Sequence, residues 1–122
     1  MSTAKKMTKT HSSASFEQFL AIQICVGTVV EAKQFPEARN PAYLLMVDFG
    51  PEIGVLKTSA QITENYELET LIGKQVVGVV NFPNKQIGPI QSQCLITGFH
   101  QPDGSVQLCV PDNKVPNGTR LL

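Results

Sequence analysis

The feature that most constrains the fold is the order of the apolar segments along the chain. Strand-like runs cover residues 22–35, 43–49, 55–62, 75–82 and 93–99, and a helix-like segment at 63–72 separates the third run from the fourth. Ile22, Ile24 and Val26 alternate with polar or small residues in the first run, and Tyr43, Leu45, Val47 and Phe49 line one face of the second. Gly27 interrupts the first run, which predicts a bend or bulge that allows one long strand to serve two sides of a barrel.

The segment at 63–72 has the end signals of a short helix. Thr63 is a candidate N-cap, Glu64 and Glu67 suit the first turn, and Gly73 is a candidate C-cap. Three strands, a short helix and two strands is the order of a five-stranded OB-fold barrel, in which the helix caps the open end. We therefore predict a mainly β fold of this type.

Residues at both ends of the predicted barrel are additions to it. Residues 16–20 have the spacing of one helical face, with Ser15 as its cap, and turns at 102–104 and 116–118 precede C-terminal strands at 105–110 and 119–122. One helical turn is not stable alone in water. We expect these additions to form the interface of a homodimer, through Phe16, Phe19, Leu20, Val106, Leu108 and Leu121.

The chain length fits one domain, at residues 16–122, preceded by a disordered tail at 1–15. The tail is rich in Ser, Thr and Lys and lacks both the apolar centre of a secretory signal and the arginines of a transit peptide. No run approaches the roughly 20 apolar residues of a membrane span. We expect a cytoplasmic protein without membrane insertion; an organellar address is the alternative.

The formal charge is zero but unevenly distributed. Lys5, Lys6 and Lys9 lie in the first ten residues, and without them seven basic residues face ten acidic ones, a net charge near −3. Strong nucleic-acid binders usually present a basic face. Any such face here must be a small local patch.

The reactive residue types are dispersed. The three cysteines, Cys25, Cys94 and Cys109, form no CxxC pair, and neither His11 nor His100 has a partner at metal-ligand spacing. We expect buried free thiols in a reducing compartment, with no metal and no cofactor. The scattered carboxylates offer no positioned acid–base pair, and no phosphate-binding loop is present, so we expect neither catalysis nor ATP use.

A polar segment broken by Pro and Gly links the fourth and fifth runs, and we interpret it as an exposed connection where ligands bind. Lysine pairs with phosphate, while serine and amide groups bond phosphate oxygens or base edges. The alternative is a solvated barrel rim, and for Arg39 a surface ion pair with Glu37 or Asp48. The candidate nucleic-acid contacts are Arg39, Lys57, Ser59, Asn81, Asn84, Lys85, Ser92 and Gln93.

Apolar residues near the same connection form a candidate peptide-binding patch. Exposed patches of this kind capture apolar segments of partner proteins. The alternative, that these side chains fill the barrel ends, is favoured for Phe35, whereas Ile87 and Ile90 lie in the connection and are expected to be partly exposed. The patch comprises Phe35, Phe82, Pro83, Ile87 and Ile90.

Several motifs resemble a known family, the tRNA-binding OB domain of some aminoacyl-tRNA synthetases and of free-standing dimers. They are VGTVVEA at residues 26–32, LIGKQVV at 71–77 and VVN at 79–81. Six further segments resemble the CsaA-type, export-related chaperone group of this family: FPEAR at 35–39, VDFG at 47–50, EIG at 52–54, SAQIT at 59–63, VNFP at 80–83 and VPNGT at 115–119. The resemblance covers residues 16–122.

The resemblance implies a non-catalytic homodimer that binds tRNA or, in the CsaA-type group, holds unfolded preproteins and contacts the export ATPase. The chain departs from tRNA-binding members after residue 81: it keeps only Lys85 of several expected cations and has Gln93 in place of a glutamate. Because phosphate contacts supply much of nucleic-acid affinity, fewer cations weaken binding. We predict an ATP-independent chaperone of exported preproteins, with a tRNA-binding module that assists tRNA recognition in trans as the alternative.

Overall fold

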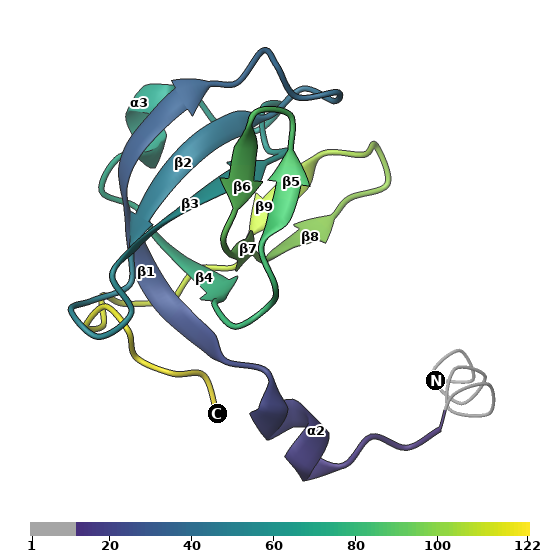
Figure 1. Cartoon of the computed structure of the whole chain (residues 1–122), viewed down its shortest axis with the longest axis vertical. Helices are drawn as coiled ribbons and strands as arrows, with labels where there is room; N and C mark the ends of the chain where they lie inside the picture. Colours follow the sequence, from purple (N-terminus) through teal and green to yellow (C-terminus); the bar gives the residue numbers. More distant parts are fainter. Residues whose placement is uncertain (1–11) are drawn as a thin grey trace.

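The computed structural model describes residues 12–122, and its centre is an antiparallel sheet rolled into a nearly closed barrel (Figure 1). The sheet has five strands in the order β3-β2-β1-β4-β7. The barrel closes where the backbone N–H of Gln93 donates to the carbonyl of Lys57 at 2.7 Å. The prediction of a five-stranded OB-type barrel is confirmed. The strands are β1 Ile24–Gln34, β2 Tyr43–Asp48, β3 Val55–Ala60, β4 Gln75–Val79 and β7 Leu95–Ile96.

Strand β1 serves two sides of the barrel, as predicted, but its irregularity is not at Gly27. The first half of β1 pairs with β4 and the second half with β2, and the register shifts between Val29 and Glu31. Gly27 lies in regular pairing opposite Val76. A Cβ at Gly27 would lie 2.7 Å from ring carbon Cδ1 of Phe49, so the glycine makes room for this buried ring. A strand glycine signals either a bulge or close packing, and here the packing decides.

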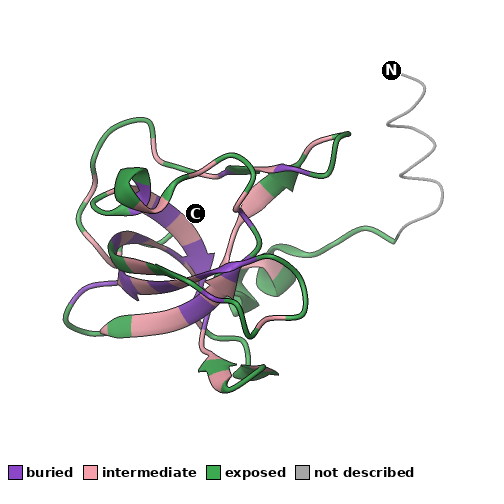
Figure 2. Ribbon diagram, turned by 90° about the horizontal axis from the view of Figure 1, so that it is seen from above, coloured by how far each residue is buried: buried purple, intermediate pink, exposed green. Residues whose placement is uncertain are grey.

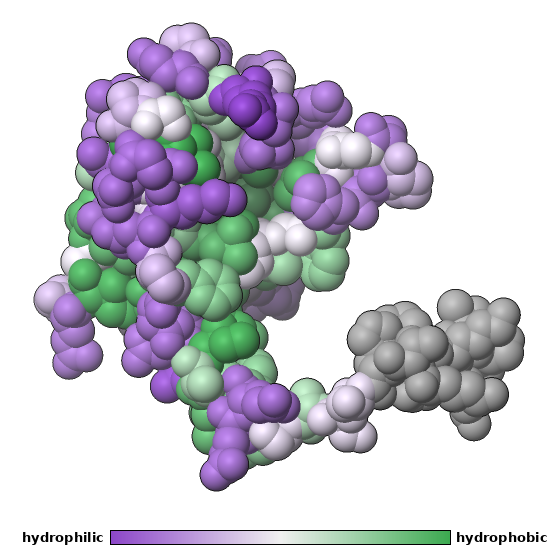
Figure 3. All heavy atoms as spheres, turned by 45° about the vertical axis from the view of Figure 1, so that its right-hand side comes forward, coloured by the Kyte–Doolittle hydropathy of each residue, from purple (hydrophilic) through white to green (hydrophobic). Residues whose placement is uncertain are grey.

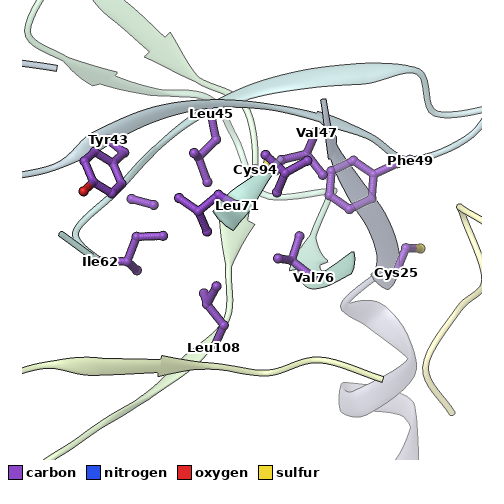
Figure 4. Close-up of a cluster of buried hydrophobic side chains, with 12 residues drawn as sticks. Cys25, Tyr43, Leu45, Val47, Phe49, Ile62, Leu71, Val76, Cys94 and Leu108 are labelled. Carbon is purple, nitrogen blue, oxygen red and sulfur yellow. The ribbon is translucent and has the colours of Figure 1, made fainter. Parts of the chain in front are cut away.

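The core is a cluster of side chains inside the barrel (Figure 4), and buried residues lie mainly on the barrel strands (Figure 2). Leu45, Val47 and Phe49 alternate along β2 and its end, which explains the period-two pattern of the sequence. Helix α3, Leu68–Leu71, packs against β1 and contributes Leu71, which is fully buried. A short amphipathic helix therefore seals the core, as its position between β3 and β4 predicted.

Helix α3 begins later than predicted. Residues 63–65 form a turn, and Glu67 occupies the N-cap position without a side-chain bond, so the assignment of Thr63 as N-cap is wrong. The preceding segment is held by tertiary bonds: the Tyr43 hydroxyl donates to the Tyr66 carbonyl at 2.8 Å, and the Tyr66 hydroxyl accepts from the Leu108 amide at 3.0 Å. These bonds replace the first helical turn. A glycine ends the helix as predicted, but one position later than the cap: Ile72 is the C-cap, and Gly73 follows it with a φ of 88°.

Helix α2, Phe16–Ala21, has the predicted Ser15 cap, completed by the Gln18 side chain, which accepts from the Ser15 amide at 2.8 Å. The helix projects from the barrel and buries none of its residues (Figure 1). Of the predicted tail, residues 12–15 are exposed and residues 1–11 lie outside the described part of the chain. The division at residue 15 stays a prediction.

The segments after β4 differ most from expectation. The fourth strand ends at Val79, and the predicted connection contains a hairpin of β5, Lys85–Ile87, and β6, Ile90–Ser92. The fifth strand is divided into β7 and β8, Gly98–His100, which pairs with β9, Val106–Leu108. Residues 119–122 form only one bridge, between Cys25 and Arg120. Strands of only two or three residues are too short for their alternation to be recognised in the sequence.

The C-terminal segment is fastened to β1 through a glycine turn. The Val26 amide donates to the Thr119 carbonyl at 2.9 Å, and the Gly118 amide donates to the Val26 carbonyl at 2.7 Å. Gly118 has a φ of 91°, and a Cβ there would lie 2.7 Å from the carbonyl oxygen of Phe49. The turn therefore requires glycine for its conformation and also for its close approach to the chain after β2.

Gly118→Ala should destabilise the fold more than Gly104→Ala does. Gly104 has a nearly identical φ of 89° but open space around it, so it isolates the conformational cost of about 1–2 kcal/mol. The backbone contact at Gly118 should add about 1–3 kcal/mol of overpacking. Urea unfolding of both variants measures the difference, and equal losses would show that the close approach has no energetic consequence.

Candidate binding groove beside the β5–β6 hairpin

A groove of about 670 Å³ lies between the β5–β6 hairpin, the loop before β2 and the end of β3. We call it the hairpin groove. In the space-filling view of this side of the molecule, apolar surface occupies the middle of the face and polar side chains border it (Figure 3). The lining residues are Ala38, Arg39, Asn40, Ala42, Ser59, Gln61, Phe82, Pro83, Lys85, Gln86, Ile87, Gly88, Ser92, Cys94 and Leu95.

Three residues of the predicted peptide-binding patch, Phe82, Pro83 and Ile87, line the hairpin groove. Phe82 is 45% exposed, and Leu95, which also lines the groove, is 51% exposed. Leu95 was missed by the sequence reasoning. A signal was available, because β-strand alternation places Leu95 on the face opposite its buried neighbour Cys94. Large apolar side chains left in solvent within one concave surface indicate a binding site.

The other two residues of that patch lie elsewhere. Phe35 is buried, in agreement with the barrel-filling alternative, and does not line the groove. Ile90 faces Ile87 across the hairpin as a strand pair, so the prediction that both lie outside a strand is wrong. Both side chains are half-buried, so the predicted partial exposure is confirmed. Gly88 turns the hairpin with a φ of 53°, and its Cβ position lies 3.2 Å from the Glu37 carbonyl oxygen. The hairpin tip therefore rests against the loop before β2.

Four of the predicted nucleic-acid contacts line the groove: Arg39, Ser59, Lys85 and Ser92. Arg39 and Lys85 are exposed. Within residues 12–122, the single ion pair joins Lys33 and Glu31 at 3.1 Å, so neither groove cation is paired with a carboxylate there. The alternative ion pair of Arg39 with Glu37 or Asp48 is therefore not formed, and both cations face solvent at the groove.

Ser92 and Gln93 serve barrel closure. The Gln93 side-chain oxygen accepts from the Lys57 amide at 2.8 Å, and the Ser92 hydroxyl accepts from the Ser59 amide at 3.3 Å. The buried Thr58 hydroxyl lies 3.0 Å from that of Ser92 and donates to the Cys94 carbonyl at 2.8 Å. These bonds hold the hairpin onto β3, and so fix the groove. Lys57, Asn84 and Gln93 do not line it.

Asn81 has a structural position outside the groove. Its side-chain oxygen accepts from the Gln23 amide, and its side-chain nitrogen donates to the Ala21 carbonyl, both at 2.9 Å. The Arg120 guanidinium also donates to the Leu20 carbonyl at the end of α2. The projecting helix α2 is thus attached to the barrel by polar bonds from the segment after β4 and from the C-terminal segment.

The predicted dimer residues divide into two groups. Leu108 belongs to the core, and Val106 packs against it, so their assignment to a free appendage is corrected: β9 completes the barrel interior (Figure 4). Phe16 is 69% exposed, Phe19 is half-buried, and Leu20 and Leu121 are exposed. The apolar surface available to a partner therefore lies on α2 and the C-terminal segment.

The chemistry offered by the groove is that of a binding surface. Cys94 is its only thiol among the lining residues, and burial raises the pKa of this thiol to about 12, which keeps it protonated near neutral pH. Within residues 12–122, no three His, Cys, Asp or Glu side chains are placed to share a metal ion. None of the helices in that part of the chain is long and apolar enough to cross a membrane.

Comparison with known proteins gives a consistent assignment. A family described as a putative tRNA binding domain matches residues 24–120. The structure of the chaperone CsaA from Bacillus anthracis str. Ames is 45% identical, with a TM-score of 0.86, over 91% of this chain and 100% of that one. The CsaA chaperone protein from Picrophilus torridus is 42% identical, with a TM-score of 0.84, over 90% of this chain and 100% of that one.

Methionine–tRNA ligase from Porphyromonas gingivalis is 32% identical over 107 residues, which is 88% of this chain and 15% of the ligase. The chain thus spans a small part of the length of the curated relatives that it matches. The CsaA structures, by contrast, are matched over their whole length.

Asn81→Ala should loosen α2 and leave the hairpin groove in place. The change leaves the Gln23 amide and the Ala21 carbonyl without their partner, at a cost of about 1–2 kcal/mol because both groups are near solvent. Hydrogen exchange should accelerate at residues 16–23 while β3 and β6 keep their protection. If tRNA affinity falls and exchange at α2 is unchanged, Asn81 is a ligand contact after all.

Proposed function

This chain belongs to the tRNA-binding domain family, and from that membership we propose that it is a CsaA-type, non-catalytic chaperone that binds unfolded preproteins without ATP. The observation that carries the proposal is the hairpin groove, in which exposed apolar side chains border a concave surface. Its position on a chain that matches CsaA structures over their full length supports the same reading. The proposed activity is cytoplasmic, upstream of export, with the export ATPase as the partner that receives the client.

The groove has the physical properties of a weak, general peptide site. A client side chain that covers the exposed parts of Phe82 and Leu95 gains roughly 1 kcal/mol at each, since both are about half exposed. Such a gain is modest for one groove, which permits release without an energy source. Two grooves on one assembly increase the apparent affinity for a long client through effective concentration.

The second candidate function is tRNA binding, and the family match is the observation that favours it. Arg39 and Lys85 supply two unpaired cations at the groove within residues 12–122. Two phosphate contacts give a shallow salt dependence, with a slope of about two in log affinity against log salt. This module would assist tRNA recognition in trans; the part of the ligase that it matches is 15% of that protein's length.

A homodimer is part of the proposal. Helix α2 buries none of its side chains, the rings of Phe16 and Phe19 stack with centroids 6.2 Å apart, and Leu121 and Leu122 are 48% and 85% exposed beside it. A helix of this length is not stable without a covering surface. In a two-fold assembly the same apolar surface covers itself, so a second copy is the proposed partner.

Phe16→Asp with Leu20→Asp should convert the dimer to a monomer, because four charges would enter the symmetric interface. Light scattering measures the molar mass of the wild-type and variant proteins in solution, at a concentration on the order of tens of micromolar, where a weak dimer is still populated. Gln34→Asp adds charge at an exposed site on β1 and should leave the dimer intact. A monomeric wild-type protein would contradict the assembly.

Phe82→Ser with Leu95→Ser should reduce protection of a chemically denatured model enzyme from aggregation, measured by turbidity without ATP. Loss of about 1 kcal/mol at each residue predicts roughly ten- to thirtyfold weaker client binding. These two residues are better probes than Ile87 and Ile90, whose replacement would disturb the hairpin pairing. Val55→Ser with Ile72→Ser is the matched control, since these side chains are 47% and 49% exposed outside the groove.

The same preparations distinguish the two candidate functions. If the wild-type protein protects no client at stoichiometric ratios but binds tRNA with a salt dependence that Arg39→Gln and Lys85→Gln reduce, the chaperone proposal fails and tRNA binding replaces it. If the control pair loses protection as strongly as Phe82→Ser with Leu95→Ser, the client site lies outside the groove.

A further inference from the structure

The charged residues that line the hairpin groove are all of one sign. Arg39 and Lys85 are both exposed, and none of the residues that line the groove is acidic. The remainder of the described chain has the opposite balance, since residues 12–122 contain seven basic and ten acidic side chains. The groove is therefore a local cationic site on an acidic domain.

From this charge distribution we propose that the hairpin groove selects unfolded segments in which Asp or Glu residues flank large apolar side chains. The inference rests on the proposed chaperone function and names its preferred client. Phe82, Ile87 and Leu95 contact the apolar side chains of the segment, and the two cations at the groove pair with its carboxylates. Arg39 presents a planar fork that suits a carboxylate, and Lys85 acts as a point charge.

Both cations are available to a ligand. Within residues 12–122, neither charged group forms an ion pair, so binding a carboxylate breaks none. A concave surface also concentrates the field of its charges relative to a flat one. The acidic remainder of the domain repels the same segment elsewhere, which favours the groove over non-specific adsorption. Glu37, whose backbone carbonyl approaches Gly88, is an acidic residue next to the groove lining.

The lining favours a peptide over RNA as the acidic ligand. Single-stranded RNA presents a phosphate at every nucleotide and is bound by several cations with successive aromatic side chains for its bases. The groove contains one aromatic residue, Phe82, and two cations, with most of its apolar lining contributed by aliphatic side chains. Aliphatic and aromatic side chains of a peptide match this surface, and carboxylates at intervals match two separated cations.

The test uses the full-length protein and three fluorescein-labelled peptides that share the same Leu and Phe positions and carry Asp, Asn or Lys between them. Fluorescence anisotropy in about 0.05 M salt should give the order Asp tighter than Asn tighter than Lys, with about fivefold between Asp and Asn for two exposed pairs. In about 1 M salt the Debye length is about 3 Å, so the exposed charges are screened from one another and the three affinities should converge.

Variants decide whether the groove is responsible. Arg39→Gln with Lys85→Gln should bring the ratio of Asp to Asn affinities to about one, and Arg39→Glu with Lys85→Glu should reverse the order in favour of the Lys peptide. Lys33→Gln with Lys114→Gln changes the net charge equally outside the groove and should keep the wild-type ratio.

Equal affinities of the three peptides for the wild-type protein overturn the inference but leave the chaperone proposal standing. An equal loss of preference in the Lys33 and Lys114 control also overturns it, because the preference would then come from net charge. If no peptide binds, the chaperone proposal itself fails. If a twelve-nucleotide uridine strand binds through Arg39 and Lys85 and displaces the Asp peptide, the cations belong to an RNA site.

Discussion

Closure of the barrel depends on a small set of bonds between β3 and residues 92–94. Strand β7 has two residues and pairs only with β4, so it is too short to close the barrel by a regular ladder. Side chains complete the closure instead: Gln93 bonds the Lys57 backbone, and the buried Thr58 hydroxyl bonds the Cys94 carbonyl. Because these groups are partly or fully buried, losing one partner would leave another unsatisfied at about 1–3 kcal/mol. The β5–β6 hairpin ends at Ser92, where these closing bonds begin, so they hold it in place. The hairpin in turn forms one side of the groove.

The molecule leaves apolar side chains in solvent at two separate places. One is the hairpin groove, held by the rigid barrel and by the contact of Gly88 with the loop before β2. The other is α2 with the C-terminal segment; polar bonds from Asn81 and Arg120 attach α2 to the barrel, from which the helix projects (Figure 1). A stable core beneath both surfaces allows them to remain uncovered in one chain. This separation suits a protein in which assembly and ligand binding use different surfaces.

Much of the candidate site could be predicted, because ring-breaking residues beside a closed sheet mark where ligands reach a barrel. Arg39, Lys85 and Phe82 come from two distant segments, and the structure places all three on one groove. Ser92 and Asn81 show the limit of this reasoning. The sequence does not show whether a polar side chain bonds a ligand or the protein's own backbone. Only the groups placed next to it in the folded chain distinguish the two roles.

The sequence by itself determined the succession of β1 to β4 along the chain, the place of α3, the Ser15 cap and the glycine that ends α3, since each depends on local periodicity or on the conformation of one residue. Tertiary structure alone decided where β1 bulges, that Gly27 makes room for Phe49, that Leu108 joins the core and that residues 85–92 form a hairpin. Each of these depends on packing between segments, or on a pairing too short for its alternation to be recognised. Local patterns do not encode which distant backbone or ring will occupy the neighbouring space, and close packing of the interior settles it.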